Sequence, residues 1–136
     1  MTEPFPVTIY HNPDCGTSRN ALAMIEQAGY SPEVVEYRKS GWTRPAIERL
    51  LAQTGLRPRD LLREKGTPAA ELGLLDDAVP DEALIAAMVK HPILVNRPIV
   101  VTPKDAKLCR PSDAVLELLE RAPEGFVKED GEVVRG

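Results

Sequence analysis

One run of sequence decides how this chain begins to fold and where its chemistry lies: Tyr10-His11-Asn12-Pro13-Asp14-Cys15-Gly16-Thr17-Ser18-Arg19-Asn20. Residues 7–10 are mostly apolar and carry β-branched side chains, which predicts a buried strand. A turn with a proline follows, and a helical pattern begins just after Cys15. The sequence therefore places one thiol at or just before a helix N-terminus, where free backbone N–H groups stabilise a thiolate and attract oxyanions.

The elements on either side of this run predict a βαβ unit. Thr17 or Ser18 is expected to cap the helix, and Gly29 is suited to the position just after its end. Residues 34–37 predict a second strand. Because a helix-length connection joins the two strands, we expect them to pair in parallel with a right-handed crossover. The apolar face of this helix is expected to be Ala21, Leu22, Ile25 and Ala28.

The middle of the chain predicts a block of helices. Thr43 is expected to open one helix and Gly55 to close it. A short helix is predicted at residues 60–65, and another that begins at Thr67-Pro68 and ends at Gly73. A longer helix is predicted at residues 81–90, just before His91-Pro92.

The C-terminal part predicts two strands and a helix. Pro98 divides two apolar runs within residues 93–102 and is expected at a turn or a strand start. Residues 104–107 predict a hairpin turn that leads to a strand at residues 108–109. Ser112 is expected to cap a last helix with Val115, Leu116 and Leu119 turned inward. The order βαβ, helices, ββα predicts an α/β fold: one thioredoxin-like domain over residues 1–136, with a mixed sheet and a helical insertion at about residues 43–91.

Composition limits the kinds of partner to expect. The 136 residues have a net charge of −4, so we expect no nucleic-acid partner. No apolar run approaches the roughly 20 residues that a membrane span needs, and the N-terminus lacks a signal-peptide pattern. Two cysteines without an export signal favour a reducing compartment, the cytoplasm. Neither the histidines nor the cysteines have a metal-binding spacing, so no metal is expected. A monomer is the default expectation.

Four segments together resemble the glutaredoxin-dependent arsenate reductases. They are the run from Ile9 to Asn20, then Leu61-Leu62-Arg63, then the run His91-Pro92-Ile93-Leu94-Val95-Asn96-Arg97-Pro98-Ile99-Val100-Val101-Thr102-Pro103, and finally Leu108-Cys109-Arg110-Pro111-Ser112. They occur in order over roughly residues 7 to 131. The first and third segments are long and specific.

The resemblance implies a thioredoxin-like fold with an inserted helical subdomain and reduction of arsenate to arsenite. It implies no bound cofactor, glutathione as a co-substrate and glutaredoxin as a partner. By position, Cys15 is then the nucleophile, and Arg63, Arg97 and Arg110 hold the oxyanion. The Arg97-Pro98 bond matches the cis-proline position of thioredoxin-like sites.

The chemistry of arsenate explains why these residue types are needed. A thiol with an ordinary pKa is mostly protonated at neutral pH, and a thiolate repels an anionic substrate. Arginines reduce both obstacles and bind oxyanions in a bidentate manner. The loop around Cys15 reads C-x-x-S rather than C-x-x-C, so one cysteine forms an adduct and an external thiol must complete the two-electron reduction. It also lacks a C-x5-R pattern, which disfavours a cysteine phosphatase.

Several residues have two interpretations on sequence alone. His11 either tunes the thiolate or acts as a structural donor at the strand end, and Ser18 either bonds the Cys15 sulfur or caps the helix. Cys109 is either a packed, inactive thiol or a disulfide partner of Cys15. Trp42 is expected to pack against the helical block.

Two other functions remain open at this stage. A glutathione-dependent thiol-transferase would use the same cationic pocket for glutathionylated substrates. A regulator of the Spx type would share the fold and contact RNA polymerase. Such regulators commonly carry C-x-x-C, whereas this chain has C-x-x-S.

Overall fold

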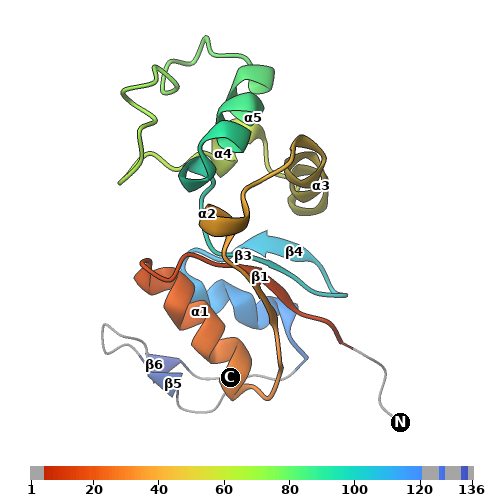
Figure 1. The fold of residues 1–136 in the computed structure, drawn as a ribbon. Helices are drawn as coiled ribbons and strands as arrows, with labels where there is room; N and C mark the ends of the chain where they lie inside the picture. Colours follow the sequence, from red (N-terminus) through yellow and green to blue (C-terminus); the bar gives the residue numbers. More distant parts are fainter. Residues whose placement is uncertain (1–4, 121–125, 128–132, 135–136) are drawn as a thin grey trace. The chain divides into compact units, whose positions relative to one another are not determined.

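The structure, a computed structural model, describes residues 5–120, 126–127 and 133–134 (Figure 1). The chain forms two compact units. The second unit is Tyr37–Asn96, which includes the predicted insertion, and the first unit combines the residues before and after it.

The first unit contains a four-stranded mixed sheet with strand order β2-β1-β3-β4. Strand β1 pairs in parallel with β2 and antiparallel with β3, and β3 and β4 form an antiparallel hairpin. This arrangement confirms the predicted thioredoxin-like α/β fold with a βαβ part and a C-terminal hairpin. The elements are β1 (Thr8–Tyr10), α1 (Gly16–Gln27), β2 (Glu33–Val35), β3 (Ile99–Val101), β4 (Ala106–Leu108), the 3-10 helix η2 (Ser112–Leu118), and a separate antiparallel pair β5 (Phe126–Val127) and β6 (Val133–Val134).

One face of this sheet forms the core of the first unit. Ile9 and Val100 are directly opposite each other on β1 and β3, and both are fully buried. Helices α1 and η2 contact each other and supply several of the other side chains of the cluster. Burial of these apolar groups fixes the register of β1, because a slip of one residue would expose Ile9. The buried cluster includes Val7, Ile9, Ala21, Met24, Ile25, Val100, Cys109, Val115 and Leu118.

The second unit is helical. Helix α5 contacts both α3 and α4. The Tyr37 hydroxyl donates to the carbonyl of Val95 at 2.8 Å, and Leu62 forms an isolated antiparallel bridge with Val95, so the two ends of the unit are tied together. The elements are α2 (Tyr37–Ser40), α3 (Arg44–Thr54), α4 (Pro58–Leu61), α5 (Asp81–Lys90) and the 3-10 helix η1 (Pro92–Leu94).

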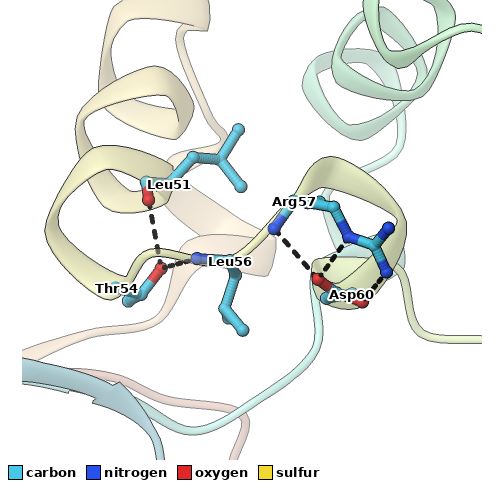
Figure 2. A network of polar contacts seen from close by, with 5 residues as sticks. All are labelled: Leu51, Thr54, Leu56, Arg57 and Asp60. Carbon is cyan, nitrogen blue, oxygen red and sulfur yellow. Dashed lines mark hydrogen bonds and ion pairs between the residues drawn. The ribbon is translucent and has the colours of Figure 1, made fainter.

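Helix α3 begins and ends at the predicted residues. The Thr43 side chain accepts from the N–H of Ala46, and Gly55 follows the helix with a φ of 74°, in the left-handed region that glycine adopts without strain. Figure 2 shows the connection to α4. The Asp60 carboxylate accepts from the backbone N–H of Arg57 at 3.1 Å and from its guanidinium group at 3.1 and 3.2 Å. This pair caps the first turn of α4.

One strand prediction and two helix predictions in this unit and its flanks are wrong in extent. The strand predicted at residues 34–37 ends at Val35, and Tyr37 begins α2. The helix predicted at residues 60–65 is α4, which ends at Leu61, because Leu62 is extended and pairs with Val95. The segment after Thr67 makes turns rather than a helix that runs to Gly73: the N–H of Leu72 bonds the carbonyl of Pro68, and Gly73 then has a φ of 72°.

Two predicted caps are also wrong. Helix α1 begins at Gly16, so Cys15 rather than Thr17 or Ser18 is its N-cap residue. The last helix is the 3-10 helix η2; its N-cap residue is Pro111, and Ser112 lies inside it. Three other predictions are confirmed: α1 buries Ala21 and Ile25, α5 spans Asp81–Lys90, and Pro98 immediately precedes β3. The predicted inward faces are right only in part, since Leu22 and Leu116 are partly buried whereas Met24 and Leu118 are fully buried. The turn predicted at residues 104–107 and the strand predicted at 108–109 are wrong in extent, because β4 spans Ala106–Leu108.

Candidate functional site

Cys15 lies where a loop from β1 enters helix α1. Its backbone is extended, with φ −105° and ψ 120°, and its carbonyl accepts the N–H of Arg19 at 2.9 Å, which begins the helical hydrogen bonding. The side chain is 8% exposed. The N–H groups of the first helical turn have no partner within the helix, so positive potential is concentrated here. The predicted position of the thiol at a helix N-terminus is confirmed.

Arg97 and Arg110 flank the hairpin of β3 and β4: Arg97 precedes β3, and Arg110 follows β4. Ile99 of β3 pairs with Leu108 of β4, so the residues just before β3 and just after β4 lie at the same end of the sheet. The guanidinium Nη1 of Arg110 donates to the carbonyl of Arg97 at 2.9 Å and approaches the Cys15 Sγ at 3.6 Å. Arg97 is buried, and the Arg97-Pro98 bond is cis, as predicted; Arg110-Pro111 is a second cis bond.

These groups set the acidity of the thiol. Burial alone raises the pKa of Cys15, because it disfavours the charged form. That effect is outweighed by the backbone N–H of Ser18, by hydrogen bonds from Arg97 and Arg110, and by the charge of Arg97, which together lower the pKa of Cys15 from 9.0 to about 7. At neutral pH about half of Cys15 is therefore thiolate, in contact with two guanidinium groups, which suits attack on an electrophilic centre that carries anionic oxygens.

Comparison with known proteins identifies the family. The model of the ArsC family matches residues 10–118, which covers the Cys15 loop and both arginines. The chain belongs to the ArsC family.

Relatives of this ArsC chain have similar lengths. It is 58% identical over 135 residues to the arsenate reductase ArsI1 of Synechocystis sp., covering 98% of this chain and 93% of the relative. It is 52% identical over 129 residues to the arsenate reductase of Escherichia coli K12, covering 94% and 92%. A solved structure, arsenate reductase from Vibrio cholerae, has a TM-score of 0.81 and 42% identity, covering 86% of this chain and 100% of that one.

His11 and Ser18 bond to each other in this ArsC chain. The His11 Nδ1 is 2.6 Å from the Ser18 Oγ, and both side chains are buried. The Ser18 side chain does not cap α1, and it is the backbone N–H of Ser18 that stabilises the thiolate. These contacts favour a structural role for the His11 side chain; that it tunes the thiolate stays a prediction.

Cys109 differs from Cys15 in its surroundings and in the direction of its pKa shift. Both thiols are free, but Cys109 is fully buried in the apolar cluster of the first unit. Burial raises the pKa of Cys109 to about 12, so the group stays protonated at physiological pH. The interpretation of Cys109 as a packed, inactive thiol fits this environment.

Arg63 belongs to the second unit. Its backbone N–H donates to the carbonyl of Leu94 at 2.7 Å, and its own carbonyl accepts from the Thr67 hydroxyl at 2.6 Å. The side-chain Nε donates to the carbonyl of Lys65 at 3.1 Å. These contacts fix the start of the side chain, and its predicted part in oxyanion binding stays a prediction.

Further observations concern metals and membranes. Within the described ranges, no three His, Cys, Asp or Glu side chains come together in a way that could hold a metal ion. Among the helices of the described residues, none has the length and apolarity that crossing a membrane requires.

Trp42 is buried in the second unit and packs on Tyr37 with ring centroids 5.2 Å apart, as expected for a packing role.

Sequence analysis did not single out Asn12, which is 1% exposed and makes three hydrogen bonds in the Cys15 loop. A signal for it was present, because an Asn-Pro pair favours the start of a turn in which the Asn side chain bonds the backbone two residues on.

Proposed function

We propose that this protein reduces arsenate to arsenite, with Cys15 as the nucleophile and with glutathione and glutaredoxin as the source of electrons. One observation supports this most strongly: the Cys15 thiolate contacts two guanidinium groups at a helix N-terminus. Membership of the ArsC family and the names of relatives more than 50% identical over nearly the whole chain support the choice of arsenate.

The first step is attack by the Cys15 thiolate on arsenic(V). A sulfur–arsenic bond forms, and one oxygen leaves as water after it gains protons. Arg97 and Arg110 reduce the repulsion between the two anions and stabilise the charge that collects on the arsenate oxygens. Glutathione then attacks the Cys15 sulfur. The sulfur–sulfur bond that forms replaces the sulfur–arsenic bond, whose electron pair remains on arsenic and makes it arsenic(III).

The last step regenerates the thiol. A glutaredoxin thiolate attacks the glutathione sulfur of the mixed disulfide, so that Cys15 leaves as a thiolate and the glutathionyl group moves to glutaredoxin. A low pKa of Cys15 favours this step, because a more acidic thiol is a better leaving group. The C-x-x-S loop offers no second thiol for an internal disulfide next to Cys15.

Arg63 is included as a third arsenate ligand on the strength of the resemblance. Its matched control is Lys65, an exposed cation two residues away in the same unit. If Arg63→Ala raises the KM for arsenate strongly and Lys65→Ala does not, the assignment is supported. Equal effects of the two variants would assign Arg63 only a general contribution of charge.

A coupled assay tests the function directly. NADPH oxidation is followed with arsenate, glutathione, glutaredoxin and glutathione reductase. We expect arsenate-dependent turnover in the parent and in Cys109→Ala, and none in Cys15→Ser. Absence of turnover in the folded parent with several glutaredoxins would refute the proposal. Release of glutathione from glutathionylated peptides in that case would support a thiol-transferase.

A further inference from the structure

Asn12 is a buried amide in the loop that precedes Cys15. Its side chain is 1% exposed, and an amide group removed from water to this extent is costly unless hydrogen bonds replace the lost hydration. Asn12 is not among the groups that act on the thiolate directly. Its burial therefore calls for an explanation in terms of the loop itself.

Three hydrogen bonds connect Asn12 to the loop. Its side-chain Oδ1 accepts the N–H of Asp14 at 2.9 Å, and its carbonyl accepts the N–H of Cys15 at 3.0 Å. Its own N–H donates to the Ser18 Oγ at 3.1 Å. The first two bonds close a tight turn over Pro13, and the third ties that turn to the first turn of α1.

We propose that Asn12 is a positioning residue for Cys15: its side chain and main chain close the turn that carries the thiol and hold that turn against Ser18. This inference rests on the proposed function in one respect only: it takes Cys15 as the reactive group of this site.

The position of Ser18 links this turn to the thiolate. The Ser18 Oγ receives the Asn12 N–H, while the Ser18 backbone N–H is the largest of the influences that stabilise the thiolate. A turn that is held at both ends keeps the Cys15 sulfur at a constant place relative to that N–H and to the Arg110 guanidinium, 3.6 Å away. A loosened turn would weaken both contacts, because hydrogen bonds fall off steeply with distance and angle.

Asparagine suits this position for a definite chemical reason. Its side-chain oxygen reaches the N–H two residues further on, which an apolar side chain cannot do. A serine hydroxyl makes the same kind of turn more weakly. The proposal therefore predicts an order of effects, with Asn12→Ser intermediate between the parent and Asn12→Ala.

The test is the pH profile of Cys15 alkylation by iodoacetamide. Cys109 does not interfere, since it is buried and protonated. We expect the midpoint to rise by about one pH unit in Asn12→Ala and by about half as much in Asn12→Ser, the size of shift that a weakened hydrogen bond to a charged group produces. The plateau rate at high pH should rise by no more than about threefold, because the nucleophilicity of a thiolate increases with its pKa.

Thr102→Val is the matched control. Thr102 is another buried polar residue of the first unit, its hydroxyl donates to the carbonyl of Leu118 at 2.8 Å, and it follows β3 at the end opposite Arg97. This variant should lose stability without moving the alkylation midpoint. A parent-like midpoint in folded Asn12→Ala overturns the proposal, as does an equal shift in Thr102→Val. If Asn12→Ala does not fold, Asn12→Ser decides in the same way.

This readout is independent of arsenate. A parent that shows no arsenate turnover would refute the proposed function, while the alkylation midpoints would still decide the role of Asn12.

Discussion

The exchange of Cys15 for serine should remove a specific dependence of stability on pH. In the folded protein the pKa of Cys15 is about 7, whereas the ordinary value, which applies to the unfolded chain, is 9.0. Between these two pH values the unfolded chain still holds the proton that the folded protein has released. The free energy of unfolding therefore rises with pH in this window. The contribution is complete above pH 9 and is lost as the pH falls through 7.

The size of the effect follows from the two pKa values. Integration of the proton difference from pH 7 to pH 9 gives about 2 kcal/mol of added stability. With a urea dependence of about 2 kcal/mol per molar, typical of a small domain, the unfolding midpoint moves by about 1 M. Cys109 contributes little in this window: burial raises its pKa from 9.0 to about 12, so it lowers the stability of the folded state by less than about half a kcal/mol between pH 7 and pH 9 and by more at higher pH.

The assay is urea unfolding at pH 7 and at pH 9 in the presence of a reducing agent. The quantity of interest is the change in midpoint between the two pH values, compared between the parent and Cys15→Ser. Subtraction within each protein removes any loss of stability that the substitution causes at all pH values. Cys109→Ala is the control and should keep the rise. If Cys15→Ser shows the same rise as the parent, the thiolate is not stabilised in the folded state and the account of the site is wrong.

Two further predictions concern arginines. Arg97→Ala and Arg110→Ala should both raise the alkylation midpoint of Cys15, within the roughly 1 to 3 pH units expected for loss of a nearby opposite charge. Arg97→Ala should raise the midpoint more, because Arg97 acts through its charge as well as through a hydrogen bond. The reverse order would contradict this ranking. Arg59→Ala should lower the free energy of unfolding by about 1 to 2 kcal/mol and speed proteolysis at residues 74–79. Arg49→Ala, at an exposed position of helix α3, should do neither. The Arg59 guanidinium donates to the carbonyls of Leu74, Asp76 and Val79.

The elements that sequence predicts well are those with local signals at both ends. Helix α3 is an example, because the Thr43 side chain and the left-handed Gly55 act on residues within one turn of themselves. The strand-to-helix junction at Cys15 is another, since an apolar strand, an Asn-Pro turn and an amphipathic helix follow one another directly.

The elements that sequence mispredicts depend on contacts with distant residues. Leu62 leaves the helix predicted at residues 60–65 because it pairs with Val95, more than thirty positions later. The segment after Thr67 has the local signals of a helix, with a cap, a proline and a closing glycine, but makes turns instead. The carbonyls at residues 74, 76 and 79, which follow this segment, accept hydrogen bonds from Arg59, so the course of the chain here depends on a residue at least 15 positions earlier.

In the candidate site, too, the sequence predicts the residues that local motifs identify but not the contacts that depend on distant residues. A motif names Cys15 and the arginines, but their proximity depends on the register of β3 and β4, which brings Arg110 to the carbonyl of Arg97. Register is set by which face of the sheet is buried, and so by side chains far from the site.

Ser18 is a residue that the motif identifies without indicating which of its atoms act at the site. Read as C-x-x-S, the loop suggests a serine in the place of a second cysteine. In the structure the stabilisation of the thiolate comes from the backbone N–H of Ser18, a group that almost any residue would supply. The hydroxyl is used for His11 and Asn12 instead. The Ser18 hydroxyl therefore bonds the loop that holds Cys15, while the backbone N–H of the same residue acts on the thiolate.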